Sequence, residues 1–263
     1  MKVGQILVAT IAVALAASAG GQTLTILWSF TSGSDGGQPD APLIQGTDGN
    51  FYGTTLIGGN TTINRGNGFG AVFRVDSSGV LTNLYSFTGY PTDGAYPTCP
   101  LVQGNDGNFY GVTQEGGDGV SGNGLGYGTV FRISPTGVET NLHSFHYSVD
   151  GGYPYAGLVL GSDGNFYGTT SSGGTGNFGT VFRITPSGVL TTIHSFTNTP
   201  GESAFPSYLG LVQGSDGNFY GTTLGGGPAT RSNTGSPSRT VRSGKSIAPT
   251  TSSVGLGSFN STR

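Results

Sequence analysis

The phrase Asp-Gly-Asn-Phe-Tyr-Gly occurs four times in this chain of 263 residues, at positions 48–53, 106–111, 163–168 and 216–221. Successive copies begin 58, 57 and 53 residues apart. That period is too long for leucine-rich or tetratricopeptide repeats and lies near the roughly 40 to 50 residues of a propeller blade. The chain is therefore interpreted as a tandem array, and any function has to follow from the repeat.

Each repeat contains four short strand-like runs, which are plainest in the third unit at 140–145, 157–160, 165–170 and 179–185. Asp163-Gly164 predicts a tight hairpin between the second and third runs, because Asp-Gly supplies the positive φ angles of a type I′ turn. The neighbours Phe166 and Tyr167 point to opposite faces of their strand. Both faces are thus expected to be covered, as in blades stacked around an axis.

The fold class predicted is all-β, a β-propeller-like array of about four repeats of 51–58 residues with no helix beyond an N-terminal leader. Fifty-one glycines exclude a helical bundle, since each costs a helix about 1 kcal/mol relative to alanine. The units expected are about 24–80, 81–138, 139–189 and 190–227. Three blades are complete. The fourth lacks the Val-Phe-Arg strand that begins at Val72, Val130 and Val181.

Residues 1–19 have the order of a secretory signal peptide: Lys2, an apolar run, and Ala17-Ser18-Ala19 as a cleavage site. The mature chain is expected to begin near Gly20, with the repeat domain at 20–227. The apolar run is shorter than a bilayer span, so we expect no transmembrane segment in the mature chain.

Residues 228–263 are rich in Ser, Thr, Arg and Gly without alternation and are expected to form an irregular or disordered tail. An alternative is a frameshift. Back-translation of residues 239–247 permits Tyr-Gly-Thr-Val-Trp-Lys-Ile-Asp in another frame, which is close to the phrase that begins at Tyr127. The coding DNA tests this hypothesis directly.

The units resemble the GloVer-type tandem repeats of the choice-of-anchor family of secreted bacterial proteins. The resemblance covers about residues 24–227 and rests on the segments 161–170, 173–174, 179–185 and 194–196. It implies export and a β-propeller-like array that is usually followed by a C-terminal surface anchor. The family supplies no established catalytic residues, and no recognisable anchor follows the fourth unit.

Two sets of repeated charged residues are candidate sites. The turn aspartates are weak calcium candidates, because each turn offers a single carboxylate whereas calcium takes about six to eight oxygens; a hairpin role is favoured for Asp48, Asp106, Asp163 and Asp216. The repeated arginines are expected to pair with a neighbouring aspartate as structural elements: Arg74, Arg132 and Arg183.

Catalytic and cofactor motifs are not recognised, so neither catalytic nor cofactor-binding residues are assigned. His143 and His194 occupy a slot that holds Trp28 and Tyr85 elsewhere, which indicates a need for a planar side chain rather than an acid-base group. His146 is outside the repeat consensus. The small slot of Cys99 favours a buried filler.

The expected function is a structural, adhesive or binding role at the cell surface or outside the cell, with glycans or surface proteins as partners. Thirteen acidic residues against four arginines in 20–227 make nucleic acid a poor partner. An unclosed array also predicts self-association through an open sheet edge. The alternative is a carbohydrate-active propeller enzyme, which requires that carboxylates converge within about 10 Å: Glu115, Asp118, Glu139 and Glu202.

Overall fold

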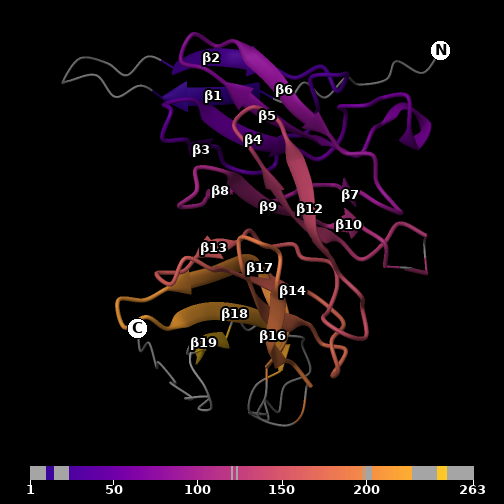
Figure 1. Cartoon of the computed structure of the whole chain (residues 1–263), viewed down its shortest axis with the longest axis vertical. Helices are drawn as coiled ribbons and strands as arrows, with labels where there is room; N and C mark the ends of the chain where they lie inside the picture. The colour runs from indigo at the N-terminus through magenta and orange to yellow at the C-terminus, as the bar shows by residue number, and fades with distance from the viewer. Residues whose placement is uncertain are drawn as a thin grey trace, which may run out of the picture.

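A computed structural model describes residues 10–14, 24–119, 121–122, 124–197, 199, 203–226 and 242–247. Within these residues the protein is all-β, and its sheets follow one another along the longest axis of the molecule (Figure 1). The one helical element of the described chain is a single 3₁₀ turn, η1, at Asn64–Gly66. No helix in this part of the chain is long and apolar enough to cross a membrane.

Three sheets are complete four-stranded antiparallel blades whose strands pair in sequence order. Blade 1 contains β3 (Ile44–Gln45), β4 (Phe51–Thr55), β5 (Ala71–Val75) and β6 (Leu81–Ser86). Blade 2 contains β8 (Val102–Gln103), β9 (Phe109–Thr113), β11 (Thr129–Ile133) and β12 (Glu139–Ser144). Blade 3 contains β13 (Val159–Leu160), β14 (Phe166–Thr170), β15 (Thr180–Ile184) and β16 (Leu190–Ser195).

The remaining strands form three smaller sheets. Sheet 4 has three strands, β17 (Ser203–Gln213), β18 (Phe219–Gly226) and β19 (Arg242–Ile247). A two-stranded sheet pairs β1 (Thr10–Ala14) with β2 (Leu24–Ser29), and another pairs β7 (Gly94–Ala95) with β10 (Glu115–Gly116). The predicted fold class is confirmed: a propeller-like, all-β array with three complete blades and an incomplete fourth.

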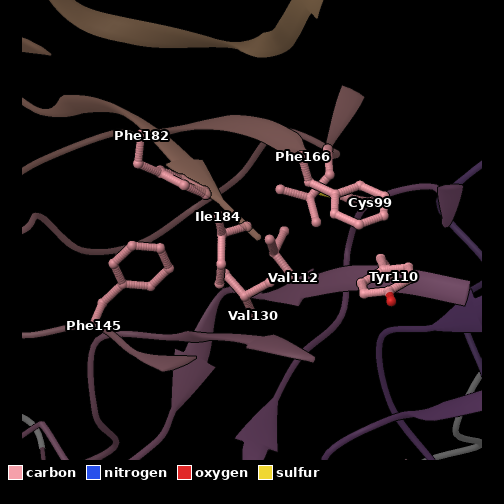
Figure 2. Close-up of a cluster of buried hydrophobic side chains, with 9 residues drawn as sticks. Cys99, Tyr110, Val112, Val130, Phe145, Phe166, Phe182 and Ile184 are labelled. Atoms are coloured by element: carbon pink, nitrogen blue, oxygen red, sulfur yellow. The ribbon is translucent and has the colours of Figure 1, made fainter. Parts of the chain in front are cut away.

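Each blade is held to the next by the Phe-Tyr pair of the repeated phrase. The tyrosine of one blade stacks on the phenylalanine of the following unit, with ring centroids 3.9–4.0 Å apart in Tyr52–Phe109, Tyr110–Phe166 and Tyr167–Phe219. All six rings are at most 1% exposed. Figure 2 shows Tyr110 and Phe166 among the apolar side chains that fill the space between blades 2 and 3. The two apolar neighbours thus cover opposite faces, as the sequence predicts.

A second aromatic row explains the glycine that ends the phrase. Phe87 meets Phe131 edge-on at 5.1 Å, and Phe145 meets Phe182 in the same way at 5.2 Å. A Cβ on Gly111 would lie 2.6 Å from the ring of Phe131. The ring therefore occupies the volume that any other side chain at that position would need.

The Asp-Gly hairpins form, but with a different turn from the one predicted. Gly161 and Asn165 pair through Gly161 N–H to Asn165 O at 2.8 Å, and Gly164 N–H donates to Gly161 O at 2.9 Å. Only Gly164 has a positive φ, so Asp163 is not one of two left-handed turn residues. The loop is thus a three-residue hairpin loop, a turn over residues 161–164 that ends on the left-handed Gly164, which is a common alternative to the two-residue type I′ turn.

Both ends of the array contain strands outside the expected units. In the segment expected to be irregular, residues 242–247 form β19, which pairs with β18. The reason is that the free edge of β18 offers unpaired backbone donors and acceptors to any extended segment. At the other end β1 lies inside the leader predicted at residues 1–19. Cleavage of that leader stays a prediction.

We expect the Tyr-Phe stacks to contribute strongly to stability. Replacing Tyr110 with Ala removes a fully buried ring, which costs about 3–5 kcal/mol for large aromatic residues, as measured by urea unfolding. The matched control is Tyr220→Ala, at the equivalent position of sheet 4, where the tyrosine is not fully buried. Equal losses for the two variants would contradict the role of the stack.

Candidate functional site

The turn aspartates lock the hairpins. In Asp106, Oδ1 accepts from the backbone N–H of Asn108, and Oδ2 accepts from Asn108 Nδ2 at 2.7 Å and from Tyr110 Oη at 2.8 Å. The same three bonds are present at Asp48, Asp163 and Asp216. Partial burial alone would raise the pKa of Asp106, but these hydrogen bonds hold it below the usual value. Burial and the carboxylate raise the pKa of Tyr110 to about 12.

This geometry joins the aspartate to the interface between blades. The tyrosine that donates to Asp106 is the ring that stacks on Phe166, so one side chain fixes both the turn and the junction. Hydrogen-bond donors occupy the carboxylate oxygens that calcium would use. Among the described residues, no group of three or more His, Cys, Asp or Glu side chains is arranged to hold a metal ion.

The repeated arginines make contacts different from those predicted. In the part of the chain that the structure describes, no aspartate forms an ion pair with Arg74, Arg132 or Arg183. Instead, Nη2 of Arg74 donates to Thr82 Oγ1 at 3.4 Å, and Arg132 makes the same bond to Thr140. The positive charge of each arginine opposes the rise in pKa of the tyrosine that holds the turn aspartate. The expected arginine–aspartate ion pairs are therefore not formed among the described residues, and each turn aspartate accepts from a tyrosine instead.

A second repeated aspartate was missed by the sequence analysis. Trp28 Nε1 donates to Asp35 at 3.3 Å, Tyr85 Oη donates to Asp93 at 2.9 Å, and His143 Nε2 lies 2.7 Å from Asp150 Oδ2. The slot that holds these planar residues therefore needs a hydrogen-bond donor as well as a flat ring. The signal was present in the sequence as an Asp-Gly pair seven or eight residues after each planar residue. Because Trp28 and Tyr85 make the same contact with their aspartates, we infer that His143 also has a structural role.

The second residue after this Asp-Gly element clamps neighbouring blades together. Tyr96 N–H donates to Phe69 O of the preceding unit at 2.9 Å, while Tyr96 O accepts from Gln114 N–H at 3.1 Å. Its φ of 60° is left-handed, and Tyr153 and Phe205 share this conformation at φ 58° and 54°. A non-glycine residue in this conformation carries strain, which the surrounding hydrogen bonds must offset.

The clamp residues place aromatic side chains at one end of the blades. We call this end the loop face; it holds the loop between the second and third strands of each blade and the connections from one blade to the next. The densest group, the tyrosine cluster, lies between blades 2 and 3. Tyr127 has ring centroids 5.3 Å from Tyr147 and 5.6 Å from Tyr153. Tyr155 Oη accepts from Gln114 Nε2 at 2.7 Å. These four tyrosines are half-buried, so each is packed and still reaches solvent.

Polar groups lie beside the tyrosine cluster. His146 Nε2 is 3.5 Å from Asp118 Oδ1, and both side chains are more than half exposed. This pair gives His146 a carboxylate neighbour that its sequence context did not show. Burial, Tyr127 and Glu115 raise the pKa of Tyr153. The cluster therefore combines aromatic faces with hydroxyl, amide, imidazole and carboxylate groups.

The structure describes three of the four carboxylates of the enzyme hypothesis, and they lie in two regions. Asp118 pairs with His146, and Glu115 lies near Tyr153. Glu139 neighbours Tyr85 and Asp93, while Glu202 lies outside the described residues. Asp118 and Glu115 therefore both border the tyrosine cluster, whereas Glu139 belongs to the group formed by Tyr85 and Asp93.

Glu139 departs from the repeat in a specific way. It takes the place of Leu81 and Leu190 at the start of the fourth strand, paired with the last residue of the third. Burial, followed by the charge of Asp93, raises its pKa to about 7, although a hydrogen bond with Tyr85 opposes the shift. A carboxyl group at a leucine position lowers the stability of the ionised protein.

Comparison with known protein families finds a repeat family. The family model described as the Gloeobacter/Verrucomicrobia repeat matches residues 14–235. No curated protein matches the chain.

Solved structures with a similar backbone fold include three enzymes or proposed enzymes. One is proposed to be a gluconolactonase (15% identity, 69% of this chain and 56% of that one, TM-score 0.42). Another is a luciferin-regenerating enzyme (14%, 83% and 62%, TM-score 0.45). A third is proposed to be a 6-phosphogluconolactonase from Bacteroides uniformis (16%, 77% and 54%, TM-score 0.47). The chain spans 54% to 62% of these structures, and no activity is carried over from them.

The raised pKa of Glu139 predicts that the stability of the protein depends on pH and that substitution of Glu139 removes this dependence. Its folded pKa of about 7 exceeds the ordinary 4.5, so the folded state binds the proton more tightly. Stability then falls as pH rises from about 4.5 to 7 and stays lower above that range. We expect Glu139→Leu and Glu139→Gln to lose this fall, and Glu139→Leu to be the more stable protein at pH 8.

The measurement is the free energy of urea unfolding at pH 5 and pH 8 for the three proteins. The effect is smaller than a fully buried carboxyl would give, because Glu139 is only partly buried and water screens its charge. The same change between the two pH values in wild type and both variants would refute the assignment.

Proposed function

The chain belongs to the Gloeobacter/Verrucomicrobia repeat family, and we propose that it is an exported binding protein that uses its loop face to attach to neutral glycans. The sequence-derived leader supports the exported location. The tyrosine cluster supports the binding role and is the observation that carries the proposal. Catalysis forms no part of this role.

Tyrosines suit such a surface for a physical reason. Their ring faces are apolar and their hydroxyls bond with polar groups, so one side chain satisfies both the C–H faces and the hydroxyls of a sugar. Tyr127, Tyr147 and Tyr153 pack against one another, which limits the rotamer freedom lost on binding. Recognition groups on loops above a rigid scaffold are also a common arrangement.

Charge favours neutral over anionic glycans. Residues 20–227 contain all 13 acidic residues of the chain and only four arginines. A surface of that sign repels sulfated or uronic acid chains, particularly at low ionic strength. Neutral hexose or pentose polymers are therefore the proposed ligands.

A panel of immobilised neutral oligosaccharides tests the proposal. We expect the wild-type chain to bind at least one of them and Tyr147→Ala to weaken that binding about tenfold, since truncating an aromatic residue that anchors a binding surface costs more than about 1 kcal/mol, and about 1.4 kcal/mol is a tenfold change in affinity. Tyr90→Ala is the matched control, because Tyr90 is 38% exposed and lies on the connection between β6 and β7, outside the tyrosine cluster.

Two results would contradict the proposal. Equal binding by wild type and Tyr147→Ala would place the glycan elsewhere on the molecule. Release of reducing sugar from any polysaccharide of the panel would favour the carbohydrate-active enzyme hypothesis instead.

A further inference from the structure

The interior junctions show which groups cover a blade face. At each junction, the tyrosine of the earlier unit stacks on the phenylalanine of the later one. The tip of that phenylalanine also approaches a glycine of the earlier unit, whose Cβ would lie 3.0–3.2 Å from Cζ at Gly46, Gly104 and Gly161. The aspartate and tyrosine of the same unit would be closer still, at 2.7–2.9 Å, so a side chain on this glycine would meet both its own turn and the incoming ring.

A third contact recurs at two of the junctions. Gln103 accepts from Thr47 N–H at 3.0 Å and donates to its hydroxyl at 3.3 Å. Gln213 makes the same two bonds to Ser162, at 3.0 and 3.2 Å. A later unit thus presents phenylalanine and glutamine, whereas an earlier unit presents tyrosine, glycine and a hydroxyl.

Sheet 4 presents an earlier-unit face with nothing stacked on it. Tyr220 is only half-buried and has no ring partner among the described residues, whereas its three counterparts are buried. The three atoms nearest to a Cβ on Gly214 belong to Asp216 and Tyr220, with no incoming phenylalanine among them, and Ser215 is exposed. Two apolar side chains on the same sheet, Val212 and Leu224, are 62% and 61% exposed. We call this surface the tail face.

Blade 1 presents the matching later-unit face. Phe51 is half-buried, while its counterparts in the other three units are at most 1% exposed. Gln45 is exposed and bonds only to its own turn at Gly49 O, whereas Gln103 and Gln213 reach across to a neighbouring blade. We call this surface the head face.

The position of strand β2 indicates which structure the head face is expected to contact. Phe30 at the end of β2 meets Phe73 edge-on at 5.0 Å, as Phe87 meets Phe131. Gly79 faces the backbone of Leu27, as Gly137 faces that of Leu84. β2 therefore lies on blade 1 as the fourth strand of a preceding blade, and sheet 4 has three strands with the fourth place open.

From these observations we propose that a second copy of this chain docks head to tail, with its tail face on the head face of the first copy. Tyr220 of one copy then stacks on Phe51 of the other, Gln45 bonds with Ser215, and β2 supplies the fourth strand of sheet 4. The two faces lie at opposite ends of the array, so they meet between copies (Figure 1).

Strand β1 occupies the place that the incoming sheet takes. Its register on β2 pairs Thr10 with Ser29 and Ile11 with Trp28 and then shifts by one residue. Third strands pair with fourth strands in the same way, with a shift after Val72 in β5. Thr10–Ala14 thus stands in for a third strand, and docking of β19 from a second copy displaces it.

Such a contact is heterologous, because two different surfaces meet, and this property gives a sharp test. Gln45→Arg blocks the head face and Ser215→Arg blocks the tail face. Ser77→Arg, on an exposed turn of blade 1, controls for the added charge. Sedimentation velocity of the full chain over a concentration series reports self-association.

We expect wild type and Ser77→Arg to associate, and each face variant to associate at least about tenfold more weakly. An equimolar mixture of Gln45→Arg and Ser215→Arg should form a one-to-one dimer, since one variant retains the tail face and the other retains the head face. Val13→Pro, which weakens the β1–β2 pairing, should strengthen association.

A monomeric wild-type chain at the highest concentration would overturn the proposal. Association that survives in both face variants would also overturn it, because that result would indicate an interface that does not use the head and tail faces. Failure of the mixed variants to form a dimer would rule out the head-to-tail arrangement.

Discussion

The stack of tyrosine on phenylalanine between successive blades is the contact on which the rest of the structure depends. One strand places Phe on one face and Tyr on the other. Every unit therefore has an aromatic ring on each face and needs a neighbouring unit to bury it. The tyrosine hydroxyl also holds the turn aspartate, which makes the hairpin and the junction one linked element. Glycine ends the phrase because the next aromatic row fills the space beside it.

Function is expected where a unit departs from this shared framework. The clamp residue before proline is aromatic at Tyr96, Tyr153 and Phe205, and at the junction of blades 2 and 3 Tyr147 and Tyr155 lie beside it. Asp118 and His146 lie beside the same group. The second departure, Glu139 at a leucine position, costs stability when ionised and lies beside Tyr85 and Asp93. The framework itself uses its aspartates for hydrogen bonds within the fold.

Much of the fold could be predicted from the sequence, because the pattern is repeated and the repeats report on one another. The hairpins, the strand order and the covered faces all follow from the shared phrase and from adjacent apolar residues such as Phe166 and Tyr167. The turn type could not be derived, since Asp-Gly suits more than one hairpin loop. The arginine contacts and the donor role of Trp28, Tyr85 and His143 were missed because they depend on side chains that meet across loops. The tyrosine cluster was also missed, since its members come from separate connections.

A double-mutant cycle on Tyr110 and Phe166 tests the central claim most directly. If stacking between blades holds the array together, the free energies of unfolding of the two alanine variants and the double variant should be non-additive by about 0.5–1.5 kcal/mol. Additive losses would show that the two rings stabilise their own blades independently, and that the array is not held by this contact.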